Sequence, residues 1–254
     1  MNKNFLKTIL GTNIMSLSRI FTEGLTSYIV SSRAAFTAAH TGDTNDLLTI
    51  PRVTLDSLLE GTPVSINLLI GKKEDGALPY EQALALISIL VKESPKTIVE
   101  VGTFLGHTTK AMAVNAPQAN IHTLDLPADF SVDADDTTHK DDFHLITSRK
   151  VGREFLNTVH ASQITQHFGD TKEYDFTKIG KADFFFIDGS HTYEYCKSDS
   201  EKSYEIANRG AVFIWHDCDF GHPGVVRFAA EWKKKGRHIV RIEGTPLAYY
   251  KKAH

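Results

Sequence analysis

The sequence predicts an α/β protein built on a doubly wound, mostly parallel sheet of seven strands. Short apolar runs alternate with helical patterns from residue 79 onward, the run at 97–101 leads into a turn with Gly102 and Gly106, and the last two runs are joined by a short link. This alternation is typical of a sheet that helices cover on both faces. Strands are expected at 97–101, 120–124, 163–168, 183–187, 211–215, 237–242 and 247–250.

Residues 1–78 precede this alternation and are expected to form a helical extension, whereas residues 79–254 form the main domain, which opens with a helix at 79–93. Apolar residues recur at helical spacing within residues 1–22, which predicts an amphipathic helix. Its apolar stripe needs a cover. Three alternatives stay open: the helix packs on its own domain, closes over a substrate as a lid, or forms a homo-oligomer contact.

The strand at 97–101 and the turn after it are the most informative segment. Gly102 and Gly106 allow a sharp turn and a close backbone approach, and the unpaired amides of the next helix can receive an anionic group. A dinucleotide-binding turn carries a second glycine two positions after the first, to make room for a pyrophosphate, but Phe104 stands there. The turn therefore indicates a nucleoside ligand without a pyrophosphate. Asp125 ends the next strand, where an acid can bind a ribose diol.

The last two predicted strands, 237–242 and 247–250, are joined by Glu243-Gly244-Thr245-Pro246. A link this short implies an antiparallel hairpin, because parallel strands need a crossover of about a dozen residues or more. The sheet is therefore expected to be parallel except at its C-terminal end.

Composition and charge exclude several classes of protein. The chain has 254 residues, and 28 Lys and Arg against 31 Asp and Glu give a formal net charge of -3, so a nucleic-acid partner is not expected. Cys196 and Cys218 form no Cys-x-x-Cys pair, which fits a reducing compartment. No apolar run has the length of a membrane span, and polar residues interrupt the N-terminal segment where a targeting peptide needs an apolar core. A soluble, cytoplasmic protein without a membrane partner is expected.

Two acids end buried strands at the edge where open α/β sheets bind ligands. Asp188 follows the apolar run 184–187, and Asp217 follows the run 211–216. Two carboxylates that converge there are costly unless a cation neutralises them, and their oxygen atoms suit Mg²⁺ or another hard divalent ion. The alternative is that both acids cap helices and that no metal binds.

Three motifs resemble those of class I S-adenosylmethionine-dependent methyltransferases. Glu-Val-Gly-Thr-x-x-Gly at 100–106, followed by Leu-Asp at 124–125, resembles motif I and its acidic partner, with the spacing of catechol-type O-methyltransferases. The runs 186–194 and 214–217 resemble those of the subgroup that contains macrocin O-methyltransferase and its cephalosporin-tailoring relatives. The resemblance covers roughly residues 79–250 and implies a Rossmann-like methyltransferase fold whose sheet ends in an antiparallel hairpin.

The resemblance also implies catalytic and metal-binding residues. His191 would be the general base, with Asp188 beside it, and an imidazole that titrates near neutrality suits an alcohol acceptor. His216 stands where sugar-methylating relatives tend to carry an acid, so the expected metal ligands are Asp188, His216 and Asp217. A histidine ligand shifts the preference toward a transition metal. The alternative for His191 is a hydrogen-bonding role or a cap of the following helix.

The cofactor would lie at the glycine turn. Glu100 would meet its ammonium group, Asp125 its ribose and Asp170 its adenine amino group. The complete set of expected cofactor-binding residues is Glu100, Gly102, Thr103, Gly106, Thr108, Asp125, Asp170 and Asp188. The alternatives are structural: Glu100 can pair with backbone amides, Thr103 and Thr108 can cap the helix, and Asp170 can stabilise a turn.

The sequence therefore predicts a cytoplasmic S-adenosylmethionine-dependent O-methyltransferase that acts, with a divalent cation such as Mg²⁺, on a small hydroxylated molecule, a sugar or another natural product. The acceptor-binding residues are expected in 1–78 and 129–160, outside the motifs. Two alternatives stay open. A nicotinamide-dependent oxidoreductase would use the same sheet, although Phe104 and the terminal hairpin disfavour it, and a non-catalytic protein could keep the cofactor-binding fold.

Overall fold

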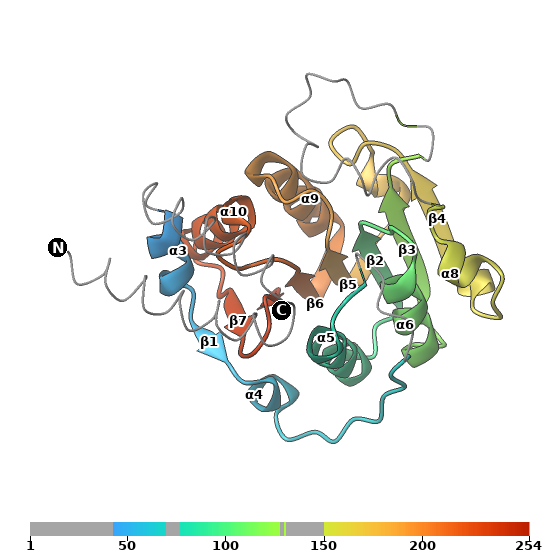
Figure 1. The fold of residues 1–254 in the computed structure, drawn as a ribbon, viewed down its shortest axis with the longest axis horizontal. Coiled ribbons are helices and arrows are strands. Elements are labelled where there is room, and N and C mark those ends of the chain that lie inside the picture. Colours follow the sequence, from blue (N-terminus) through green and yellow to red (C-terminus); the bar gives the residue numbers. More distant parts are fainter. Residues whose placement is uncertain (1–42, 70–76, 128–129, 131–149, 254) are drawn as a thin grey trace, which may run out of the picture.

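The computed structural model describes residues 43–69, 77–127, 130 and 150–253. They form an eight-stranded sheet in the order β1-β7-β8-β6-β5-β2-β3-β4, with helices on both faces (Figure 1). The amphipathic helix predicted within residues 1–22 and most of the segment 129–160 lie outside the described residues. Within the described ranges, no helix has the length and apolar character that crossing a membrane requires.

The sheet confirms the predicted fold class. Strands β2 to β6 pair in parallel, and β8 runs antiparallel to both β6 and β7, as the short C-terminal link predicts. The strands are β1 (Arg52–Val53), β2 (Thr97–Val101), β3 (Asn120–Asp125), β4 (Ile164–Phe168), β5 (Ala182–Ile187), β6 (Ala207–Trp215), β7 (Val240–Ile242) and β8 (Ala248–Lys251). The eighth strand, β1, was not predicted, because two residues are too few to show an alternating pattern.

The helices form two layers around this sheet. In Figure 1, α3, α9 and α10 lie on one side of the strands, and α5 and α6 lie on the other. The helices are α3 (Asp43–Thr49), α4 (Leu55–Leu59), α5 (Tyr80–Glu93), α6 (His107–Asn115), α8 (Arg153–Leu156), α9 (Tyr193–Ile206) and α10 (Pro223–Lys234), with short 3₁₀ helices η1 (Ala161–Gln163) and η2 (Phe176–Lys178). The helix predicted at 79–93 is α5.

The central strands are buried on both faces. Along β5, Phe184 and Phe186 belong to the core under α5 and α6, whereas Phe185 and Ile187 belong to the core under α9 and α10. Full burial of one such side chain stabilises the fold by about 1.5–3 kcal/mol. A strand with two buried faces reads as a continuous apolar run, which is why Phe184 to Ile187 shows no alternation.

The described part of the N-terminal extension is tied to the sheet. Helix α3 packs on α10, and Leu47 and Ile50 are buried in the same core as that helix. Strand β1 pairs with β7, where Arg52 lies opposite Arg241. The lid or oligomer role for the first residues of the extension stays a prediction.

The turn after β2 is held by contacts with its neighbours. The amide of Gly102 donates to the carbonyl of Leu124 over 2.9 Å, and the amide of Asp188 donates to the carbonyl of Val101 over 2.8 Å. Gly102 has φ +96°, and a Cβ at this position would overlap the carbonyl oxygen of Asp188. The glycine therefore lets the end of β5 approach the turn.

We expect Gly102→Ala to destabilise the protein by roughly 3 kcal/mol or more, because strain from a positive φ adds to a backbone overlap that no rotamer can relieve. Gly244 is the matched control, since its φ is +78° but a Cβ there would meet nothing within 4 Å. Gly244→Ala should cost only about 1 kcal/mol. Denaturant unfolding of both variants measures the difference, and equal losses would contradict a specific contact at Gly102.

Candidate active site

The site lies at the carboxyl ends of neighbouring strands. Asp188 follows β5 and Asp217 follows β6, and the amide of His216 donates to the carbonyl of Ile187 over 3.0 Å, so the two strand ends stay side by side. Asp217 has φ 56°, a left-handed conformation that few residues other than glycine adopt. The predicted convergence of the two acids is therefore realised.

His216 lies between the two carboxylates. Its Nδ1 atom is 3.0 Å from Oδ1 of Asp188 and 2.8 Å from Oδ2 of Asp217, while Nε2 is 2.7 Å from Oε1 of Gln82 on α5. Burial opposes the charged imidazole, but the two carboxylates outweigh it and raise the pKa of His216 well above its usual value. In the absence of a metal, His216 is therefore an imidazolium that neutralises both acids. No local sequence pattern indicated Gln82, which lies far away along the chain.

The proposed capping roles of these acids and of His191 are wrong. Helix α9 is capped by Thr192, whose hydroxyl accepts from the amide of Tyr195, and the residue at the cap position of α10 is His222. Asp188, His191 and Asp217 are thus available for other interactions at the strand ends.

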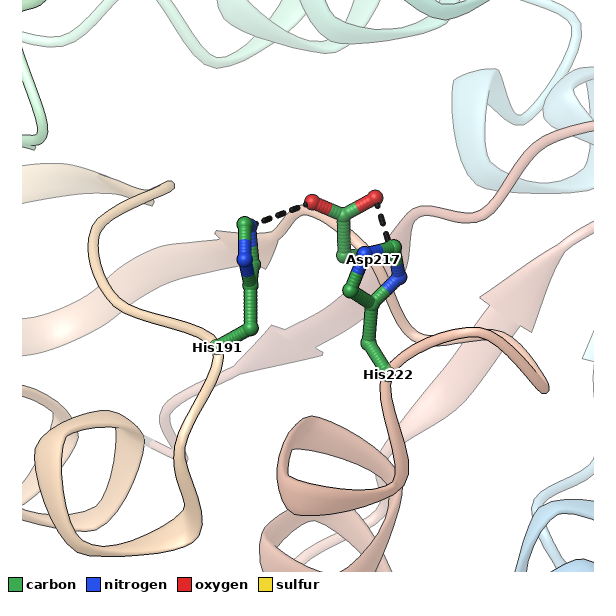
Figure 2. Close-up of side chains that lie close together, drawn as sticks. All are labelled: His191, Asp217 and His222. Carbon is green, nitrogen blue, oxygen red and sulfur yellow. Dashed lines mark ion pairs between the residues drawn. The ribbon is translucent and has the colours of Figure 1, made fainter. Parts of the chain in front are cut away.

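Asp217 is surrounded by histidines (Figure 2). Nε2 of His191 is 2.8 Å from its Oδ2, and Nδ1 of His222 is 3.4 Å from its Oδ1. Burial opposes the charged form of Asp217, but His216, His191 and His222 prevail and lower the pKa of Asp217 well below its usual value. Asp217 is therefore an ionised acceptor that orients the ring of His191.

His222 was not predicted as a site residue. It lies at the start of α10, and its Nδ1 is 3.0 Å from Oδ1 of Asp219. His191, Asp217 and His222 form one group whose ligand atoms lie within 4.8 Å of one another, and Asp188, His216 and Asp217 form another. The second group is the predicted set of metal ligands. One sequence feature could have indicated the first group: His222 begins a His-Pro-Gly helix start just after Asp217 and Asp219.

Glu100 is fully buried beneath the glycine turn. Its Oε2 accepts hydrogen bonds from the hydroxyls of Thr109 and Thr123, and its Oε1 is buried without a hydrogen-bond partner. Burial raises the pKa of Glu100 from 4.5 to about 8, against the lowering effect of the two hydroxyls. The structural alternative, pairing with backbone amides, is wrong, because side-chain hydroxyls hold this acid.

The two predicted threonines differ in their surroundings. The Oγ1 atoms of Thr103 and Thr123 are 2.6 Å apart, so Thr103 extends the hydroxyl network of Glu100. Thr108 is partly buried in the first turn of α6, whose cap residue is Gly106. A Cβ on Gly106 would lie 2.6 Å from Cδ1 of Phe155, so packing against α8 requires this glycine.

The two remaining acids are held by local hydrogen bonds. Asp125 accepts from the amide of Phe104 over 2.6 Å and from that of Leu126 over 2.7 Å, so it fixes the glycine turn to the end of β3. Asp170 accepts from the amide of Lys172 over 2.8 Å and from the hydroxyl of Tyr195 over 2.9 Å. The turn role expected as the alternative for Asp170 is confirmed, and Tyr195 ties that turn to α9.

Glycine turn, strand-end acids and terminal hairpin thus occur together on one sheet. Residues 99–218 match the family model of a methyltransferase domain. This range begins inside β2 and ends just after Asp217, so it contains Asp188, Asp217 and the glycine turn, while His222 lies beyond it.

The fold of this chain also occurs in solved structures. A cofactor-bound protein from MTB has 16% identity and a TM-score of 0.55, over 88% of this chain and 97% of the other. An SAH-bound methyltransferase from Podospora anserina has 13% identity and a TM-score of 0.54, over 71% and 81%. An O-methyltransferase from Bacillus cereus in complex with SAH has 16% identity and a TM-score of 0.50, over 78% and 90%. These likenesses show a common fold, and no curated protein matches the sequence significantly.

We expect Glu100→Gln to change how the stability of the protein depends on pH. Between pH 4.5 and about 8 the folded protein keeps a proton on Glu100 that the unfolded chain has lost, so the free energy of unfolding falls as pH rises. Because glutamine does not titrate, the variant should lack this fall in the free energy of unfolding, which is of the order of a few kcal/mol. Burial also raises the pKa of Asp199 to about 7, so the slope should shrink rather than vanish.

Urea unfolding of the ligand-free protein across this pH range measures the effect. Glu243→Gln is the control, because Glu243 is exposed and its replacement should leave the slope unchanged. An unchanged slope in the Glu100 variant would show that this carboxyl group is ionised in the folded protein.

Proposed function

We propose that the protein transfers a methyl group from S-adenosylmethionine to a hydroxyl group of a small molecule. The observation that carries the proposal is the His191–Asp217 pair, 2.8 Å from Nε2 to Oδ2, beside a glycine turn that packs on Asp188. His191, the expected base, therefore lies three residues after Asp188, whose backbone contacts the glycine turn that is expected to bind the cofactor. Proximity of this kind is what transfer between two bound molecules requires.

The residues beneath the turn fit the cofactor. Glu100 has a buried carboxylate oxygen, Oε1, without a hydrogen-bond partner, and an ammonium group would satisfy it. Asp125 lies at the end of β3, where an acid suits a ribose diol. S-adenosylmethionine would supply an electrophilic methyl group here.

His191 would act as the general base through one defined nitrogen. Its Nε2–H donates to Oδ2 of Asp217, which leaves the lone pair on Nδ1. Nδ1 would take the proton of the acceptor hydroxyl, and the ionised Asp217 would stabilise the resulting imidazolium. This is the role that a carboxylate plays beside a catalytic histidine.

Asp188, His216 and Asp217 fit a divalent cation, with Mg²⁺ as the first candidate. Gln82 accepts from Nε2 of His216, so Nδ1 faces the two carboxylates, an arrangement in which a second residue orients a metal-bound histidine. A cation held there would lower the pKa of a nearby acceptor hydroxyl.

The motif resemblance favours a sugar or another natural product as the acceptor, within the subgroup of macrocin O-methyltransferase and its cephalosporin-tailoring relatives. Residues 1–78 and 129–160 would contribute to the acceptor site, and a homo-oligomer could form through residues 1–22. We place the protein in the cytoplasm, because the buried thiols of Cys196 and Cys218 are both free. Neither a nucleic acid nor a membrane is an expected partner.

The first test is calorimetric titration of the full-length protein with S-adenosylmethionine, with a nicotinamide dinucleotide titrated in parallel. Saturable binding of S-adenosylmethionine alone is expected, because the turn carries Phe104 where a pyrophosphate would need glycine. Binding of the dinucleotide alone would replace the proposal with an oxidoreductase. Binding of neither would indicate a protein without the cofactor.

Once an acceptor is in hand, His191→Ala should lower kcat by about 10²–10⁴-fold, because the hydroxyl loses its base. The affinity for S-adenosylmethionine should stay within experimental error. His238→Ala is the control, since His238 is exposed. A loss of cofactor affinity in the His191 variant would assign this residue to cofactor binding, and full activity would remove it from catalysis.

A further inference from the structure

Asp217 belongs to two groups of potential ligands. One group shares it with Asp188 and His216, and the other shares it with His191 and His222. In the second group His191 and His222 approach Asp217 from two sides, as Figure 2 shows, and their ring centroids are 4.5 Å apart. His191 and Asp217 act in methyl transfer as proposed above, whereas His222 has no role in it.

The backbone holds the two histidines together. A Cβ on Gly224, in the first turn of α10, would overlap the carbonyl oxygen of His191 and would lie 2.6 Å from the amide nitrogen of Tyr193. Only a glycine allows this approach between the start of α10 and the loop before α9. The backbone segments that carry His191 and His222 are therefore packed directly against each other.

The donor set has its own metal preference. Two imidazole nitrogens and one carboxylate oxygen suit zinc, cobalt, nickel or ferrous iron, whereas Mg²⁺ prefers a set in which oxygen ligands dominate. The side chains of His191 and His222 are each 30% exposed and that of Asp217 is 13% exposed, so an ion can reach them from solvent. Oδ1 of Asp219 lies 3.0 Å from Nδ1 of His222 and offers a further oxygen next to the group.

We infer that His191, Asp217 and His222 bind a transition-metal ion at a position separate from the Asp188–His216–Asp217 group. The ion would take Nε2 of His191, Nδ1 of His222 and a carboxylate oxygen of Asp217, with water completing its coordination. Asp217 would be shared between the two positions, while Asp188 belongs to one group and His222 to the other.

The same ion would switch off His191 as a base, a consequence that rests on the proposed function. Catalysis needs the proton on Nε2 and the lone pair on Nδ1, because Nε2 donates to Asp217. A metal on Nε2 requires the opposite tautomer, with the proton on Nδ1. Metal binding at this position and proton removal by His191 therefore exclude each other.

The test is titration of the full-length protein with Co²⁺, followed by the visible absorption of bound cobalt. The Asp188→Asn variant serves as the background, because it removes one ligand of the other group only. It should bind one equivalent of Co²⁺, and adding His222→Ala should weaken that binding by at least about 100-fold, since even outer partners of metal ligands change affinity by about 10–100-fold. Adding His238→Ala, at an exposed residue, should change nothing.

Affinity for Co²⁺ that is unchanged by His222→Ala would overturn the inference. His222 makes no side-chain cap bond to α10, so its loss should leave the helix start intact, and circular dichroism checks this. His222→Cys is the second variant: direct ligation should add a sulfur-to-cobalt charge-transfer band, and a folded variant without this band would also overturn the inference. Neither readout uses S-adenosylmethionine, so failure of the methyltransferase proposal would be seen separately.

Discussion

The charges of Asp188 and Asp217 constrain everything around them. Both acids end neighbouring strands, and His216 lies within 3.0 Å of each. A buried charge without a partner costs several kcal/mol, so carboxylates this close are tolerated only when cations or strong donors face them. The domain meets this condition with three histidines, which keep Asp217 ionised. The site is thus a compensated charge cluster in which histidines balance the charge of the acids.

Rigid packing makes such a cluster possible. The strands that end at the site are buried on both faces, and two glycines, Gly102 and Gly224, allow backbone segments to meet where any Cβ would overlap. Side chains at the strand ends are therefore placed by the core. Glu100, beneath the glycine turn, is also fixed in position, because hydroxyl groups of α6 and β3 hold its carboxyl group in the interior. Preorganised groups lose little entropy when a ligand arrives.

Sequence patterns predicted the sheet, the terminal hairpin and the convergence of Asp188, His216 and Asp217, because each depends on local signals: apolar runs, a short link and polar residues at strand ends. Relations between distant segments were not predictable. Gln82 orients His216 from α5, and His222 reaches Asp217 from α10, yet neither residue has a local pattern that assigns it. Gly106 was predicted for ligand approach, and the structure adds a tertiary requirement that the sequence did not indicate, contact with Phe155. Strand β1 was missed because two residues carry no periodicity.

That short strand has a consequence for how molecules of this protein meet. A sheet edge presents unpaired amide and carbonyl groups, and a long, flat edge is a template for pairing with another chain. Among the described residues, strand β1 ends the sheet with only Arg52 and Val53, directly after Pro51, and Arg52 is exposed. A proline, a charge and minimal length are the means by which natural proteins protect such edges from aggregation. Self-association by sheet extension at this edge is therefore disfavoured.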